Sequence, residues 1–144
     1  SYLQRLLSLD EGVRNHPYTD TVGKVSIGIG RNLTDVGLSE DEVQFLFEND
    51  VRVATVIAQQ TVSSFNSLSL VRQMVLIDMT FNLGHRLSLF QQTIAEINNG
   101  DYEKAAKSML ASVWAKQVGD RAIRLAEMMR TGIAYQFPTG KLYY

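Results

Sequence analysis

Two carboxylates and a hydroxyl near the start of the chain have the residue types and the spacing that acid–base catalysis requires. They belong to Glu11, Asp20 and Ser26. Glu11 follows Leu7 by four residues and Leu3 by eight, so on a helix it shares their apolar face. An acid on a buried face is partly desolvated, and desolvation favours its protonated form. Glu11 is therefore a candidate proton donor, with Asp20 as the carboxylate that stays ionised.

A helix followed by a β-hairpin is expected to position these groups. Apolar residues recur at helical spacing before the first carboxylate, and residues 20–23 have the composition of a turn. From residue 24 to residue 30 the pattern alternates, which predicts a strand. The apolar face of that strand would carry Val25, Ile27 and Ile29. Ser26 would lie on the other face, which Gly28 and Gly30 leave open to the close approach of a ligand.

The order of these motifs resembles that of the phage-type lysozymes, glycoside hydrolase family 24, which include the T-even type of endolysin. The motifs are D-E-G at 10–12, Y-x-D-x-x-G at 18–23 and S-I-G-I-G-x-x-L-T at 26–34. Further similarity lies at 81–84, at Trp114 with Gln117 and Arg121, and at 130–132. The resemblance covers about residues 2 to 135, which is nearly the whole chain.

The resemblance implies a muramidase that hydrolyses the β-1,4 bond between N-acetylmuramic acid and N-acetylglucosamine in bacterial peptidoglycan. Glu11 would protonate the glycosidic oxygen, while Asp20 and Ser26 would hold the attacking water and give inversion at the anomeric carbon. Inversion needs about 6.5–9.5 Å between the two carboxyl groups. The family usually has threonine at position 26; serine keeps the hydroxyl but loses the methyl group that restrains its rotamer. Gly28 and Gly30 would support the site, with no cofactor and no metal.

The same resemblance assigns residues to substrate binding. They are Asn32, Phe81, Thr93 and Ser108. For Phe81 packing in the core is an equal alternative, because it is in helical register with Met74 and Ile77. Trp114 is expected to have a structural role and to donate a hydrogen bond to Asn82 or Gln117.

Two ion pairs are also expected by resemblance. Arg121 would pair with Glu11, or else lie solvated beside the apolar face of its own helix. Arg31 stands where the family commonly has histidine, and it would pair with Asp50. Because arginine does not titrate near neutral pH, that pair would be insensitive to pH on the basic side.

The expected fold is α+β and mostly α, with a small antiparallel β-lobe and a helical lobe joined by a long helix, and with a cleft between them. One domain would span residues 1–144. The β-lobe would cover about 13–45, the connecting helix about 46–60, and the helical lobe about 61–144 with residues 1–12. Ser39 and Glu42 form a capping box that opens the connecting helix. Further helices are expected at 67–84, 87–98, 101–112 and 120–131.

Composition narrows the set of partners. The net charge of −1 gives no polycationic tract for nucleic acid, and no apolar run approaches the roughly 20 residues that span a bilayer. The chain has no cysteine and only two histidines, which makes a zinc site improbable. We therefore expect a monomer that binds peptidoglycan. The first residues lack a signal-peptide layout, and the resemblance implies a host bacterial cytoplasm before release, with a membrane-permeabilising partner.

Two other functions remain open at this point. A lytic transglycosylase needs the acid but no second carboxylate to activate water, so Asp20 with Ser26 argues against it. A non-catalytic peptidoglycan-binding module would have no use for the two carboxylates that the chain retains.

Overall fold

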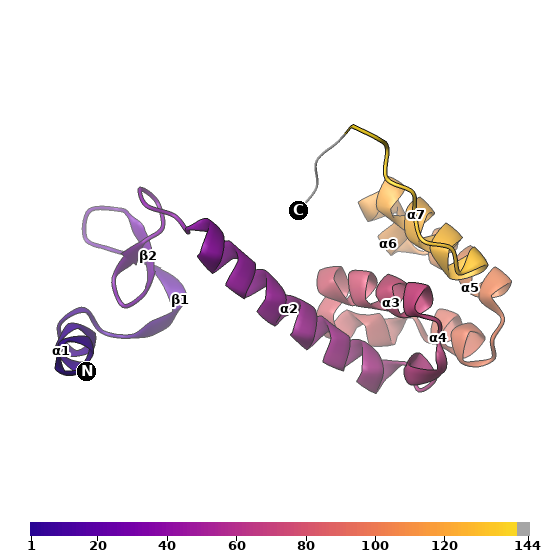
Figure 1. The fold of residues 1–144 in the computed structure, drawn as a ribbon, viewed down its shortest axis with the longest axis horizontal. Helices are drawn as coiled ribbons and strands as arrows, with labels where there is room; N and C mark the ends of the chain where they lie inside the picture. Colours follow the sequence, from indigo (N-terminus) through magenta and orange to yellow (C-terminus); the bar gives the residue numbers. More distant parts are fainter. Residues whose placement is uncertain (141–144) are drawn as a thin grey trace. The chain divides into compact units, whose positions relative to one another are not determined.

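The structure is a computed structural model that describes residues 1–140 (Figure 1). It confirms the predicted α+β, mostly α class, with seven α-helices and one three-stranded antiparallel sheet in that range. The chain forms two compact units, Ser1–Phe47 and the part from Glu48 onward. The assignment of residues 1–12 to the helical lobe stays a prediction, and residues 141–144 of the expected domain lie outside the described part.

The first unit holds one helix and the whole sheet. Its elements are α1 (Tyr2–Glu11), β1 (Arg14–Thr19), β2 (Val25–Gly28) and β3 (Arg31–Asn32). The strands follow one another in the order β1-β2-β3. The predicted hairpin is confirmed, since the N–H of Asp20 donates to the carbonyl of Lys24 at 2.8 Å and β1 pairs antiparallel with β2. The two-residue strand β3 is too short to be recognised by alternation.

The buried face of β2 is the one that carries Ser26, and not the one predicted to carry the apolar side chains. Val25 is 37% exposed and Ile29 is 48% exposed, whereas Ser26 is buried at 5%. Ile29 lies after the end of β2, so the alternation outlasts the strand. An alternating pattern shows that a strand has two different faces, but not which of them the rest of a small unit covers. Ser26 is the only buried residue among residues 1–47.

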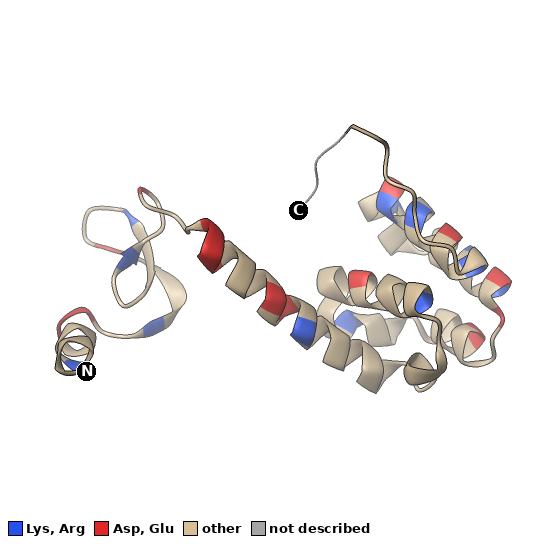
Figure 2. Cartoon of the chain, viewed as in Figure 1, with Lys and Arg blue, Asp and Glu red and all other residues tan. Residues whose placement is uncertain are grey.

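The long helix α2 (Glu40–Thr61) begins and ends close to the predicted limits and runs from the first unit into the second. The predicted capping box is confirmed. The N–H of Glu42 donates to Oγ of Ser39 at 3.2 Å, and the N–H of Ser39 donates to Oε1 of Glu42 at 3.0 Å. Three acids occupy the first turn, coloured red at the start of α2 in Figure 2, where they suit the positive end of the helix dipole.

The second unit is helical. After α2 its elements are η1 (Phe65–Ser67), α3 (Leu70–Leu83), η2 (Gly84–Leu89), α4 (Gln91–Asn98), α5 (Tyr102–Ala111), α6 (Val113–Val118) and α7 (Asp120–Thr131). The helix expected from residue 67 begins later, because Leu68 is extended and the side chain of Ser69 caps α3. Gly84 ends α3 with φ at 59°, as predicted. The short helix α6 has no counterpart among the predictions.

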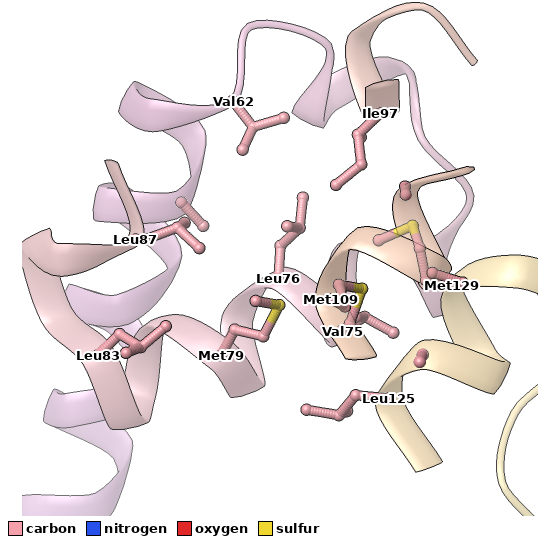
Figure 3. Close-up of a cluster of buried hydrophobic side chains, with 14 of the residues drawn as sticks. Val62, Val75, Leu76, Met79, Leu83, Leu87, Ile97, Met109, Leu125 and Met129 are labelled. Carbon is pink, nitrogen blue, oxygen red and sulfur yellow. The ribbon is translucent and has the colours of Figure 1, made fainter. Parts of the chain in front are cut away.

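The core of the second unit surrounds α3 (Figure 3). Leu76 and Met79 are the centre of this cluster, where Met109 from α5 and Met129 from α7 meet them. The central position predicted for α3 is confirmed. The predicted stripe through Met74 is nevertheless the more exposed side of the helix. A helix that is apolar on most sides does not reveal its buried face by periodicity.

Candidate active site

Glu11 is the last residue of α1, and its carboxyl group lies against the backbone of Gly30. A Cβ atom placed on Gly30 would be 2.9 Å from Oε2 of Glu11 and 3.2 Å from its Cδ. Gly30 also has φ at 73°, which side chains rarely adopt. The expected burial of Glu11 is wrong in this structure, since Glu11 is exposed and α1 has no buried residue.

Asp20 occupies the turn between β1 and β2, where backbone donors fix its side chain. Its Oδ1 accepts the N–H of Val22 at 3.0 Å and the N–H of Lys24 at 2.8 Å. Such an Asx-type arrangement holds the carboxylate in one orientation. Within residues 1–140 no hydrogen bond to Oδ2 is formed, so that oxygen is available to a ligand.

Ser26 lies in the middle strand of the sheet, opposite Tyr18 on β1 and opposite Asn32 on β3. Its hydroxyl has no hydrogen-bond partner in the described part of the chain. Ser26 is buried as a residue, but no fully enclosed side-chain oxygen or nitrogen lacks a partner in the described part of the chain, so its unpaired Oγ keeps some access to solvent and is suited to hold a small polar ligand.

The three predicted catalytic side chains therefore share one support, β2 with the bends on either side of it. The bend before β2 carries Asp20, the strand itself carries Ser26, and the bend after β2 contacts Glu11 at Gly30. Gly28, at the end of the strand, also has a positive φ of 70°. The sequence spacing predicted this association with one hairpin; the contact between Glu11 and Gly30 was not predicted.

Asn32 also belongs to the first unit, on β3, but its amide group is engaged within its own turn. Its Nδ2 donates to Oδ2 of Asp35 at 3.1 Å, and its Oδ1 accepts the N–H of Asp35 at 3.0 Å. Lys24 forms an ion pair with the same aspartate at 3.1 Å. The substrate contact predicted for Asn32 stays a prediction, and its observed contacts are structural.

Phe81 lies on α3 of the second unit and is 45% exposed, so the alternative of core packing is wrong. It borders a small hollow of about 190 Å³ together with Asp50 and Val53 of α2. Its exposure agrees with a surface role, and its substrate contact stays a prediction.

Thr93 and Ser108 line a larger hollow of about 840 Å³ in the second unit. Thr93 belongs to α4 and Ser108 belongs to α5. The hydroxyl of Ser108 donates to Oε1 of Glu96 at 2.5 Å. Trp114 closes another side of the hollow and is itself buried, and its Nε1 donates to Oδ1 of Asn82 at 3.0 Å. The structural role predicted for Trp114 is confirmed. Two substrate-binding predictions thus meet at one cavity, which the sequence did not predict.

Arg121 is bonded within the second unit. Its Nε donates to Oδ1 of Asp78 at 2.7 Å and its Nη2 donates to the carbonyl of Asp78 at 3.0 Å. The pairing predicted with Glu11 would join the two units and stays a prediction.

Arg31 has a different partner from the expected Asp50. Its Nη1 lies 2.6 and 2.7 Å from the two carboxylate oxygens of Glu42, and it also donates to the carbonyl of Gly37 at 3.2 Å. This hydrogen-bonded pair, with further bonds from Ser39, lowers the pKa of Glu42 to about 2. Glu42 was recognised in the sequence as a capping residue, but a capping role gives no sign of a partner on β3.

Residues 1–140 contain neither a cluster of metal-ligating side chains nor a helix that could span a membrane. No group of three or more histidine, aspartate or glutamate side chains gathers there in an arrangement that could hold a metal ion. None of the described helices combines the length and the apolar character needed to cross a bilayer.

Comparison with known proteins gives the class to which this fold and these residues belong. A family model described as phage lysozyme matches residues 9–130, so the chain belongs to the phage lysozyme family and is a glycoside hydrolase. Two relatives come from Dictyostelium discoideum. Probable T4-type lysozyme 1 is 29% identical, over 92% of this chain and 95% of that protein, and probable T4-type lysozyme 2 is 28% identical, over 95% and 98%. The pre-baseplate central spike protein Gp5 of Enterobacteria phage T4 is 27% identical over 90% of this chain, which covers 28% of that protein.

Proposed function

We propose that the protein hydrolyses the β-1,4 bond between N-acetylmuramic acid and N-acetylglucosamine in peptidoglycan, with Glu11 as general acid. The observation that carries the proposal is the position of Glu11 against Gly30. Gly30 lies in the bend after β2, the strand that bears Ser26 and follows the turn of Asp20. Membership of the phage lysozyme family supports the same substrate.

Glu11 would donate its proton to the glycosidic oxygen as the bond to the anomeric carbon breaks. Glu11 is an exposed residue, so a glycan strand could reach it, and the bound strand would then displace water from it. Loss of water favours the protonated form of a carboxyl group, which is the form that a general acid needs. The proton transfer makes the departing sugar a neutral alcohol.

Asp20 and Ser26 would place the water that attacks the anomeric carbon. One oxygen of Asp20 is held by two backbone N–H groups, which leaves Oδ2 to accept a proton from that water. The hydroxyl of Ser26, unused within residues 1–140, would accept or donate a second bond to it. Attack from the face opposite the leaving group inverts the anomeric centre, and an ionised Asp20 also stabilises the oxocarbenium-like transition state.

The test is clearance of outer-membrane-permeabilised bacteria by the wild type and by Glu11→Gln, with analysis of the soluble products. We expect the wild type to release fragments with reducing ends, and Glu11→Gln to lose at least about a hundredfold in rate while it keeps its fold. Proton NMR of the fresh products should show the inverted anomer. Fragments with 1,6-anhydro ends would identify a lytic transglycosylase instead. Equal clearance by the two proteins would remove Glu11 from the mechanism, and no clearance by the wild type would leave only a peptidoglycan-binding module.

The proposed biological setting is release of a phage from its bacterial host. Other biological settings are alternatives to test, because one relative comes from Dictyostelium discoideum and another is a spike protein of a phage. If the chain acts from the host cytoplasm, its production in bacteria should cause lysis only when a second protein permeabilises the inner membrane. Lysis without such a protein would contradict this localisation.

A further inference from the structure

Asp35 lies in the turn after β3 and binds two side chains of the first unit at the same time. Its Oδ1 accepts a hydrogen bond from the ammonium of Lys24 at 3.1 Å, and its Oδ2 accepts one from Nδ2 of Asn32 at 3.1 Å. The N–H of Asp35 in turn donates to Oδ1 of Asn32 at 3.0 Å. The two oxygens of this carboxylate thus have separate partners, so Asn32 fixes the group that holds the ammonium of Lys24.

Lys24 is also the residue whose backbone holds Asp20. Its N–H donates to Oδ1 of Asp20 at 2.8 Å, and its carbonyl accepts the N–H of Asp20 at 2.8 Å. Because an N–Cα bond is about 1.5 Å long, Oδ1 of Asp20 lies roughly 4 Å from the Cα of Lys24. The flexible four-carbon stem of a lysine can fold back over such a distance. Within residues 1–140 the ammonium nevertheless forms its ion pair with Asp35 and not with Asp20.

An ammonium group so close to Asp20 is a competitor for the oxygen that the proposed mechanism uses. Oδ2 of Asp20 accepts no hydrogen bond in the described part of the chain, and in the proposed function it binds the attacking water. A lysine that paired with Oδ2 would take the place of this water. It would also offset the negative charge that stabilises an oxocarbenium-like transition state.

We infer that Asp35 is a positioning residue, which holds the ammonium of Lys24 away from Asp20 and so leaves Oδ2 of Asp20 to the attacking water. The inference rests on the proposed function and adds a residue that touches neither the substrate nor the water. The side chains of Lys24 and Asp35 are 40% and 52% exposed. An exposed ion pair shifts an equilibrium by up to about fivefold, so the effect on the rate should be of that size.

The test is a double-mutant cycle that measures kcat and KM for the hydrolysis of murein. Asp35→Asn removes the charge but keeps an oxygen for the amide of Asn32. We expect it to lower kcat about two- to fivefold with KM nearly unchanged, because no contact with the sugars is altered. Lys24→Gln removes the ammonium and keeps the backbone N–H that holds Asp20. In that background Asp35→Asn should have almost no further effect on kcat.

Salt provides a second readout that a merely structural role of Asp35 would not change. Exposed charges are screened by salt, so the misplaced pair between Lys24 and Asp20 should weaken as the ionic strength rises. Raising it from about 0.01 M to about 1 M should bring the kcat of Asp35→Asn back toward that of the wild type in the same buffers.

The matched control is Asp41→Asn, which removes another exposed carboxylate of the same unit and changes the net charge equally. It should keep the wild-type kcat at both ionic strengths, and thermal melts should show that all variants are folded. A wild-type kcat for Asp35→Asn would overturn the inference and leave the proposed function intact. So would an equal loss with and without the ammonium of Lys24. Failure of the wild type to cleave murein would overturn both.

Discussion

At the scale of the residue, Gly30 allows the bend after β2 to lie close to Glu11, because it has no side chain. Gly30→Ala would bring a methyl group to 2.9 Å from Oε2 of Glu11, so the carboxyl group would have to move. A displacement of about an ångström at a reacting group costs up to about a hundredfold in rate. We expect Gly30→Ala to lose between about tenfold and a hundredfold in kcat, measured on permeabilised cells.

The control for that variant is Gly37→Ala, which has the same backbone strain without the contact. Gly37 has φ at 67°, and a Cβ placed there meets nothing closer than 4.0 Å. Each substitution should cost about 1–2 kcal/mol of stability because of its positive φ. If Gly37→Ala loses as much activity as Gly30→Ala, the loss comes from strain and not from the displaced acid.

Ser26 has a different expected signature, because it would act on the water and not on the acid. Ser26→Ala should lower kcat about a hundredfold and leave KM nearly unchanged, since the hydroxyl is not proposed to bind the sugar. Ser26→Thr should retain activity, because it keeps the hydroxyl. Full activity of Ser26→Ala would remove the hydroxyl from the mechanism and leave Asp20 alone with the water.

At the scale of the element, Arg31 joins β3 to the first turn of α2 through Glu42. The pKa of Glu42 lies at about 2 in the fold against an ordinary 4.5, so folding favours its ionised form. The stabilisation is present in full above pH 4.5 and is lost as the pH falls toward about 2. Arg31→Ala should lower the melting temperature at pH 7 and flatten its decline between pH 5 and 2, with kcat nearly unchanged. The measurement is the melting temperature of the wild type and of Arg31→Ala between pH 2 and pH 7. An unchanged melting temperature with lost activity would give Arg31 a catalytic role.

The elements also show which patterns in the sequence were informative. The capping box of Ser39 fixed the start of α2, and Gly84 ended α3, because both signals depend on contacts between near neighbours in the chain. The side of β2 that is buried, and the partner of Arg31, depend on other elements and could not be derived from local pattern. The six-residue helix α6 is too short to show a helical period.

At the scale of the whole molecule, the buried apolar side chains are concentrated in the second unit. Among residues 1–47 the one buried residue is Ser26, whereas Leu76 and its neighbours in the other unit are fully enclosed. Leu76→Ala should therefore cost about 2–5 kcal/mol in denaturant unfolding. Ile29→Ala in the first unit should cost about 1 kcal/mol or less, since its side chain is already half exposed. Similar costs for the two variants would contradict this distribution of stability.

The sequence associated the candidate catalytic groups with one hairpin, but it gave no sign of the large hollow in the second unit. Glu11, Asp20 and Ser26 lie close together in the chain, so their spacing was enough to associate them with one hairpin. The hollow of about 840 Å³ is lined by residues of α3, η2, α4, α5 and α6. Such a cavity forms only when the helices pack, so no local pattern in the sequence indicates it.

The near absence of an interior in the first unit has a consequence for heat tolerance. The hairpin and its turns are held mainly by hydrogen bonds and by turns that need glycines with positive φ, and not by buried apolar contacts. They can therefore open at a free-energy cost well below that of unfolding the helical unit. Activity should be lost on warming at temperatures below the main calorimetric transition, where the helical unit is still folded. The activity should return on cooling. A cross-link in the hairpin should then raise the temperature at which activity is lost. Repacking the core around Met79, Met109 and Met129 in the second unit should raise it much less.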